Sequence, residues 1–329
     1  MSELVHVGQS AELVQVGQNE ELLEQNELYV PAAPVRILLD TDIGPDCDDA
    51  GAVAVLHALE RAGEVKIAGM MHCTSSRWGA GCLDALNVYY AREGIPVGTL
   101  KEPGFLDDDS VHAKYNKGIT LQYPNRYREE EAPDAVALYR QLLAEAPDGE
   151  TVIVAIGPLP NLQLLLESGA DAYSPLSGLE LAARKVKHLI VMGGHFPEGA
   201  EWNFQMHPAS AAYVCEHWPT AITFTGFEIG IDIHTGSRLF TDLPAEHPVR
   251  QSYAWYVGEG GTRHSWDLTA VLYAARGYES YWELVRGHIS VNAENGANTW
   301  QNDPAGRHGY LKVKLAPEQI AELLDELML

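Results

Sequence analysis

The sequence is poor in positive charge. It holds 22 Lys and Arg residues against 46 Asp and Glu residues, only eight of the 22 are Lys, and the formal net charge is -24. A field of this sign repels phosphate backbones, so the composition argues against a nucleic-acid partner and disfavours polyanionic substrates. A small neutral substrate is compatible with it.

The sequence also has few cysteines and lacks long apolar runs. Its four cysteines show no paired metal-ligand spacing and suggest no disulfide framework in a chain of 329 residues: Cys47, Cys73, Cys82 and Cys215. No apolar run approaches the ~20 residues that span a membrane. The N-terminus lacks the basic region and apolar stretch of a secretory signal. We therefore expect a cytoplasmic protein with reduced thiols and no membrane partner.

Composition divides the chain near residue 34. Residues 1–34 are rich in Glu and Gln and end in the stretch PAAP, which predicts an acidic N-terminal extension. The remaining residues, 35–329, contain no linker rich in Pro, Gly and Ser. A hydrophobic fraction of 46% is ordinary for a globular protein, and a chain of this length can bury a large core. We expect residues 35–329 to form one domain.

From residue 35 onward, apolar runs alternate with helical patterns, which is typical of a parallel α/β sheet. The expected strands are residues 36–40, 65–71, 151–156, 188–192 and 221–225, and the expected helices are 50–62, 80–91, 134–145, 159–167 and 208–217. Each expected strand ends in a polar or glycine-rich turn. Because ligands bind at the carboxyl ends of the strands in such sheets, these five turns predict one site.

The first of these turns holds five aspartates in ten residues and no basic residue: Asp40, Asp42, Asp46, Asp48 and Asp49. Carboxylates this close repel one another unless positive charge lies among them. A helix N-terminus supplies about half a charge and can hold one or two of them. A divalent cation could organise the rest, and calcium suits flexible carboxylate sites best. The alternative is a solvated turn with one N-cap aspartate.

This loop resembles the N-terminal signature of the nucleoside hydrolase family, the inosine-uridine-preferring nucleoside N-ribohydrolases. The family core is Asp-x-Asp-Pro-Gly-x-Asp-Asp, and the sequence DTDIGPDCDD is a longer variant with two extra residues. The resemblance covers roughly residues 35–300. It implies a Rossmann-like α/β fold, with an open, mostly parallel sheet flanked by helices and the active site at the carboxyl ends of the strands. It also implies a small-molecule nucleoside or riboside as substrate, and we expect a homodimer or homotetramer.

By this resemblance Asp42 is the general base for water and a ligand of calcium. Asp48 and Asp49 match the closing pair of the signature, so one would bind the metal and the other a ribose hydroxyl, the metal or both. Asp46 has no counterpart and is either an extra ligand or a brace of the loop. Asp40 would hold the loop by backbone hydrogen bonds.

Two later blocks agree with the family in the same order. The stretch GAEWNFQMHPA resembles the family's Glu-x-Asn followed by Asp-Pro, which implies that Glu201 and Asn203 bind the sugar hydroxyls. The same two residues could equally be turn and cap residues, and His207 stands at the usual Asp, where we expect it to affect a helix start. In SWDLTAVL, Asp267 would complete the calcium shell, and Trp266 stands where relatives often carry a proton-donating histidine.

Three further positions complete the predicted site. Pro160 replaces a threonine whose backbone carbonyl binds the metal in the family, and proline keeps that carbonyl. Ser76 stands where relatives often carry an asparagine that contacts the sugar. Tyr253 and Trp266 flank a glycine-rich stretch, residues 258–262, and could stack on a leaving base as part of a lid, although aromatics at this spacing more often pack helices. The missing histidine leaves leaving-group protonation open, and His264, two residues earlier, is either a substitute or, as a lone loop histidine is more often, a bystander.

Other classes explain less of the sequence. A phosphatase of the haloacid dehalogenase type also places Asp-x-Asp after a strand. It needs a lysine and a further acidic pair on later strands, whereas lysine is scarce here, and it leaves the Glu-x-Asn block unexplained. An EF-hand needs glycine at the sixth and glutamate at the twelfth loop position, and both are absent. A calcium- or sugar-binding relative without turnover remains an alternative, because Trp266 cannot donate a catalytic proton. The predicted activity is calcium-dependent hydrolysis of an N-glycosidic bond.

Overall fold

The strands follow the predicted pattern and extend it. The computed structural model describes residues 34–329, so the predicted N-terminal extension lies outside the described residues except for Pro34. The main-sheet strands are β1 (Val35–Thr41), β2 (Val65–His72), β3 (Val97–Thr99), β4 (Thr151–Ala155), β5 (Val186–Met192), β6 (Glu198–Ala200), β7 (Ala221–Thr225), β10 (Trp282–Val291), β11 (Ala297–Asn302) and β12 (His308–Val313). A separate antiparallel pair is β8 (His234–Thr235) and β9 (Arg263–His264).

The helices that the sequence predicts begin and end within two residues of the observed bounds. The helices among the described residues are α2 (Asp48–Arg61), α3 (Gly79–Tyr89), α4 (Asp109–His112), α5 (Asn116–Gln122), the 3-10 helix η1 (Arg126–Arg128), α6 (Ala135–Glu145), α7 (Pro160–Glu167), α8 (Gly178–Lys185), α9 (Trp202–Met206), α10 (Pro208–His217), α11 (Phe227–Gly230), α12 (Leu239–Asp242), α13 (Pro248–Val257), α14 (Trp266–Arg276) and α15 (Pro317–Met328). No helix of residues 34–329 is long and apolar enough to cross a bilayer.

Within residues 34–329, ten strands form one sheet in the order β3-β2-β1-β4-β5-β7-β12-β10-β11-β6. Neighbours from β3 to β12 are parallel, and β12, β10, β11 and β6 pair antiparallel. The fold is therefore the predicted mostly parallel α/β sheet. The antiparallel end was not predicted, because β10 to β12 lie in the aromatic-rich part of the sequence, where no strand was expected.

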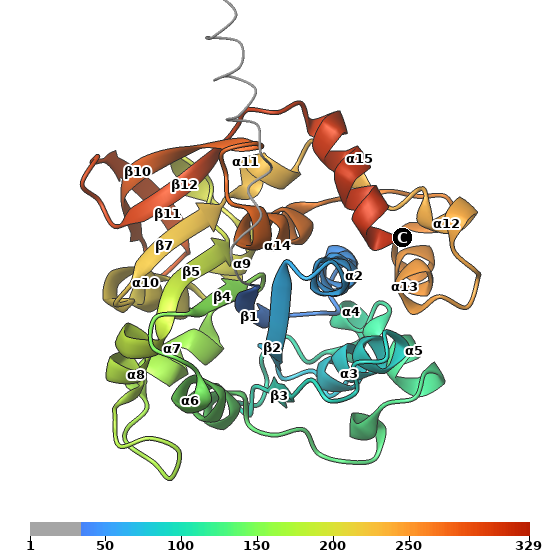
Figure 1. Ribbon diagram of the computed structural model, residues 1–329, viewed down its shortest axis with the longest axis horizontal. Helices are drawn as coiled ribbons and strands as arrows, with labels where there is room; N and C mark the ends of the chain where they lie inside the picture. Colours follow the sequence, from blue (N-terminus) through green and yellow to red (C-terminus); the bar gives the residue numbers. More distant parts are fainter. Residues whose placement is uncertain (1–33) are drawn as a thin grey trace, which may run out of the picture. The chain divides into compact units, whose positions relative to one another are not determined.

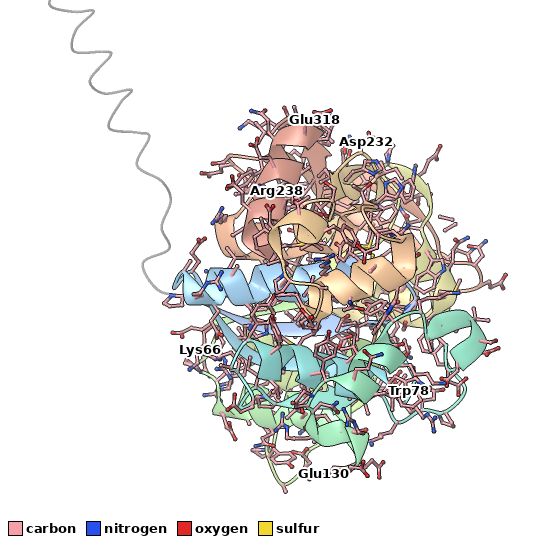
Figure 2. All side chains as sticks on the ribbon, turned by 90° about the vertical axis from the view of Figure 1, so that its right-hand side faces the viewer. Lys66, Trp78, Glu130, Asp232, Arg238 and Glu318 are labelled. Carbon is pink, nitrogen blue, oxygen red and sulfur yellow. The ribbon has the colours of Figure 1, made fainter. Side chains whose placement is uncertain are left out.

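Helices cover both faces of the sheet, with α2, α3 and α14 on one face and α6, α7, α8 and α10 on the other (Figure 1). Strand β1 shows why its sequence is a continuous apolar run. Ile37 and Leu39 belong to one core and Leu38 to the other, because successive side chains point to opposite faces. Charged side chains such as Lys66, Glu130 and Glu318 point outward (Figure 2).

The parallel arrangement sets the position of the site. Strands β1, β2, β4, β5 and β7 run in the same direction, so their carboxyl ends share one edge of the sheet. The acidic loop follows β1 at this edge and leads directly into α2. Asp48 and Asp49 therefore occupy the first turn of α2, where the helix dipole favours negative charge.

Candidate active site

Asp40 braces the loop from inside the protein. Its carboxylate accepts hydrogen bonds from the Tyr139 hydroxyl at 2.9 Å and from the Asn161 side-chain amide at 3.0 Å, rather than the expected backbone bonds. Burial raises the pKa of Asp40 to about 7. Asp40 is fully buried and does not line the pocket. Its contacts fix the end of β1 against α6 and α7.

Two helix N-termini meet at the next carboxylates. Asp48, in the first turn of α2, accepts hydrogen bonds from the backbone N–H groups of Trp266 at 3.1 Å and Asp267 at 3.2 Å, which begin α14. Asp49 accepts from the Thr41 hydroxyl. Asp267 lies in the first turn of α14. The first turns of α2 and α14 thus place three buried carboxylates beside two positive dipole ends.

Asp46, Asp49 and Asp267 each offer a carboxylate oxygen, and these oxygens all lie within 4.8 Å of one another. Burial raises the pKa values of Asp42, Asp48, Asp49 and Asp267 well above their usual range, and their mutual repulsion raises them further. All three residues offer hard oxygen donors, which divalent cations such as Ca²⁺ prefer. The residues therefore fit a cation, with Asp46 in the cluster as the sequence analysis allowed.

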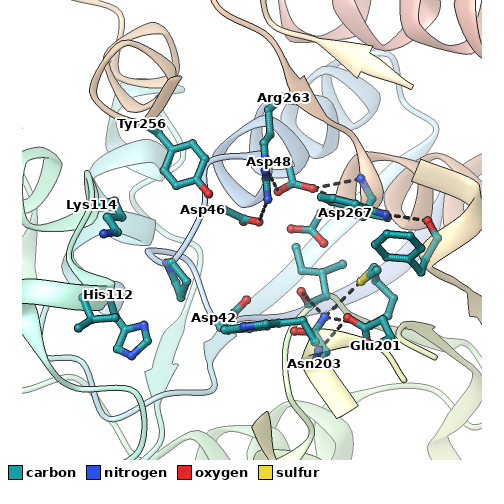
Figure 3. Close-up of a pocket in the computed structure, with 17 residues that line it drawn as sticks. Asp42, Asp46, Asp48, His112, Lys114, Glu201, Asn203, Tyr256, Arg263 and Asp267 are labelled. Carbon is teal, nitrogen blue, oxygen red and sulfur yellow. Dashed lines mark hydrogen bonds and ion pairs between the residues drawn. The ribbon is translucent and has the colours of Figure 1, made fainter. Parts of the chain in front are cut away.

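A pocket of about 390 Å³ opens beside this cluster (Figure 3). Residues from the ends of β1, β4, β5 and β7 line it, and the turn after β2 contributes no lining residue. The lining residues are Asp42, Pro45, Asp46, Asp48, Val111, His112, Lys114, Ile156, Met192, Glu201, Trp202, Asn203, Phe227, Tyr256, Arg263, Trp266 and Asp267. Figure 3 shows His112 and Lys114 across the pocket from Asp267. Four of the five predicted strand ends therefore form one site.

Glu201 and Asn203 are cap residues and also line this pocket. Glu201 caps α9: its carboxylate accepts from the backbone N–H groups of Asn203 at 2.7 Å, Phe204 at 3.3 Å and Gly194 at 3.2 Å. Burial raises its pKa to about 7 despite these bonds. The Asn203 amide donates to the Met192 carbonyl at 3.1 Å. His207 caps α10, as expected. Capping holds Glu201 at the pocket wall, with lone pairs left for a further donor.

Trp266 lines the pocket, but its polar atom is already occupied. The indole N–H donates to the Phe227 carbonyl at 2.8 Å, and the two rings lie 5.6 Å apart. The indole can therefore present only its apolar face to a ligand. The sequence suggested His264 as a substitute acid, but His264 does not line the pocket, whereas His112 does.

Several predicted positions lie outside the pocket lining. Ser76 faces a neighbouring cavity, and Pro160 begins α7. Asp49 lies behind the lining, within the carboxylate cluster. Tyr253 is fully buried, with its hydroxyl 3.9 Å from the Met328 sulfur. For Tyr253 the helix-packing alternative fits the structure, because this face of α13 packs into the core.

The structure adds residues that the sequence analysis did not assign to the site. Tyr256, one turn beyond Tyr253 on α13, reaches the pocket in its place. Arg263 pairs with Asp46 at 2.6 Å, although the two are 217 residues apart. Phe227 follows β7 in one of the predicted turns, so its position was a usable signal. His112 and Lys114 lie at the end of α4 and just beyond it, and no motif marked them.

Comparisons with known proteins agree with this architecture. Residues 37–314 match the family model of the inosine-uridine preferring nucleoside hydrolases, and the chain therefore belongs to this family. This confirms the resemblance predicted from the sequence. No curated protein matches the chain significantly.

Solved structures share the fold at low sequence identity. A plant nucleoside hydrolase, PpNRh1, is 20% identical with a TM-score of 0.67, covering 90% of this chain and 99% of that one. A purine-preferring ribonucleoside hydrolase from Gardnerella vaginalis is 16% identical with a TM-score of 0.68, covering 89% and 98%. The type III effector protein XopQ, complexed with adenosine diphosphate ribose, is 15% identical with a TM-score of 0.67, covering 94% and 98%.

Proposed function

We propose that this protein hydrolyses the N-glycosidic bond of a ribonucleoside or related riboside, with a bound divalent cation, Ca²⁺ by preference. The observation that carries the proposal is the position of Asp42. It lies at the end of the first strand, lines a pocket of 390 Å³ and shares that pocket with Asp48, Asp267 and Glu201. Membership of the nucleoside hydrolase family supports the reaction class.

The cation would be held by Asp46, Asp49 and Asp267, whose oxygens lie close together, with Asp42, Asp48 and the Pro160 carbonyl as further ligands. When bound, it would lower the pKa of a coordinated water and hold that water beside two sugar hydroxyls. Calcium is preferred over magnesium because it accepts more oxygen ligands in less regular geometry.

The protein side chains would then perform the remaining work. Asp42 takes a proton from the water as the water oxygen bonds to the anomeric carbon, and the bond from that carbon to the leaving nitrogen breaks. Burial and the neighbouring carboxylates raise the pKa of Asp42, which makes its carboxylate a stronger base. Glu201 accepts a hydrogen bond from a sugar hydroxyl, and Asn203 contacts the opposite side of the ribose.

The leaving base lies against the apolar part of the wall, where Trp266 and Phe227 present their rings. No titratable group of Trp266 is available to protonate that base. The reaction therefore depends on the cation, on ribose binding and on stacking. Ser76 and Tyr253 contribute at most indirectly, since neither lines the pocket.

Turnover of inosine, uridine and nitrophenyl riboside with added Ca²⁺ tests the proposal, with Asp42→Asn as the critical variant. Loss of the Asp42 carboxylate as general base should reduce kcat by at least the ~10²–10⁴-fold typical of acid–base catalysis. Near-normal turnover by folded Asp42→Asn would remove Asp42 from this role. Ribose binding without turnover on any substrate would favour a binding protein, the alternative supported by the occupied indole N–H of Trp266.

A haloacid dehalogenase-type reaction is the other alternative outcome, and nitrophenyl phosphate turnover would reveal it. The expected homodimer or homotetramer and the cytoplasmic location stay predictions. Light scattering of the purified protein would measure the first, and cell fractionation the second.

A further inference from the structure

Arg263 is the cation that the protein itself supplies to the acidic cluster. Its guanidinium donates to the Asp46 carboxylate at 2.6 Å, and its Nε lies 4.0 Å from an oxygen of Asp48. Among the described residues no other Lys, Arg or His forms an ion pair with the pocket's carboxylates. Lys114 also lines the pocket, but Arg263 is the positive side chain that pairs with its aspartates.

Aromatic rings fix where this charge lies. The guanidinium carbon is 5.2 Å from the centre of the Tyr256 ring and 5.0 Å from that of Trp266. Both are within the range of cation–π attraction. Arg263 is also held by its backbone, because it belongs to β9, which pairs with β8. Figure 3 shows its side chain pointing toward Asp46 and Asp48.

Asp46 is shared between Arg263 and the cation cluster. One carboxylate oxygen binds the guanidinium, and Asp46 also contributes an oxygen to the group with Asp49 and Asp267. Asp46 is also the aspartate that has no counterpart in the short family signature. The extra acid and the arginine that binds it thus form a pair at the edge of the proposed cation site.

We propose that Arg263 sets the cation affinity of this pocket, an inference that rests on the cation-dependent function proposed above. Arg263 holds Asp46 beside Asp49 and Asp267, and its own charge opposes the bound cation. The second effect is the larger one. Calcium–oxygen distances are ~2.3–2.6 Å, so a cation bound to Asp46 lies within several ångströms of the guanidinium. Like charges at that separation repel strongly in a partly buried site.

The positioning effect is smaller because it saves only the ordering of one short side chain. Removal of the arginine charge should therefore tighten calcium binding rather than weaken it. A purely structural role for Arg263 predicts a different result, namely a lower melting temperature with unchanged calcium affinity.

Calorimetric titration of the full chain with Ca²⁺ tests this, with no substrate present. Arg263→Gln should bind Ca²⁺ at least tenfold more tightly than the wild type, and Arg263→Lys, which keeps the charge, should stay within about threefold of it. Asp46→Asn should bind at least tenfold more weakly, because it loses a ligand. Arg238→Gln, a surface arginine paired with Asp242, is the matched control and should not change the affinity.

The outcomes separate this inference from the proposed function. A wild type that binds Ca²⁺, with Arg263→Gln equal or weaker, overturns the role of Arg263 alone. No binding by wild type or variant overturns both that role and the proposed calcium dependence. Binding by Arg263→Gln alone supports the inference. Should Arg263→Gln fail to fold, Arg263→Leu keeps an apolar side chain between the two rings and must show the same gain.

Discussion

The backbone N–H of Trp266 donates to the carboxylate of Asp48 at 3.1 Å, which joins the first turn of α14 to the first turn of α2. The same carboxylate oxygen accepts from Asp267 at 3.2 Å. Asp48 is 1% exposed, so its lost hydration must be replaced by these bonds and by the helix dipoles. Asp48 is therefore a structural acceptor as well as a candidate cation ligand.

We expect Asp48→Ala and Asp48→Asn to differ in the cation-free protein. Alanine leaves two buried N–H groups without an acceptor, which should lower the free energy of unfolding by roughly 2 kcal/mol or more. Asparagine keeps an acceptor oxygen and removes one repelling charge, so its stability should equal or exceed that of the wild type. The free energy of unfolding of each variant, measured in chelator and then in Ca²⁺, tests these expectations. Equal losses for the two variants would refute this account, and exposed Asp242→Asn provides the control.

The space left by Gly157, which has no side chain, should determine where the Asp42 carboxylate lies. A Cβ at this position would lie 2.8 Å from the backbone nitrogen of Asp42 and 2.9 Å from one carboxylate oxygen, so Asp42 must shift. We expect Gly157→Ala to reduce kcat at least tenfold, since small misplacements of catalytic groups are costly. Gly169→Ala, which meets nothing within 4 Å, should leave kcat unchanged. A fully active Gly157→Ala would show that Asp42 tolerates displacement.

Substrates with good leaving groups should react fastest. The indole N–H of Trp266 is bound to the Phe227 carbonyl and cannot titrate, so nitrophenyl riboside should turn over far faster than inosine or uridine. Trp266→His should increase inosine cleavage relative to nitrophenyl riboside. Comparable rates on both substrates in the wild type would point to another acid. His112 would then be tested first, through His112→Asn, because it lines the pocket.

His57 should make the protein less stable in mild acid. Burial lowers its pKa to about 4, while the Asn87 side chain and the Tyr90 ring contact the imidazole. The unfolded chain takes up the proton near pH 6.5 and the folded one only near 4, so this contribution to stability is present above 6.5 and is lost as the pH falls toward 4. Urea unfolding at pH 7.5 and 5 should show His57→Gln losing about 2 kcal/mol less than the wild type. If the wild type and His57→Gln lose the same free energy of unfolding between the two pH values, the assignment is contradicted. The exposed His234→Gln is the control.

The predicted part of the fold follows from local patterns. β1 is apolar on both faces because cores lie on both sides, and its short length and the polar turn that follows it identify it as a strand from sequence alone. The acidic loop was visible because five carboxylates in ten residues need compensation. Both features depend on neighbours within a few residues along the chain.

What the sequence could not predict depends on distant partners. The Asp46–Arg263 pair joins residues 217 apart, and the Trp266 N–H is occupied by a carbonyl 39 residues away. Tyr253 and Tyr256 share an aromatic pattern, and only the packing of α13 decides that the second reaches the pocket. Side-chain direction and partner choice are tertiary properties, and sequence spacing alone does not determine them.

The bond between Asp48 and Trp266 also bears on how the protein is made. The two residues are 218 positions apart, so at a synthesis rate of ~5–20 residues per second the acidic loop leaves the ribosome on the order of 10–45 s before its partners exist. During that interval the nascent chain exposes clustered aspartates with neither Arg263 nor the first turn of α14 to compensate them. The binding pocket therefore cannot be complete before residue 267 has been synthesised.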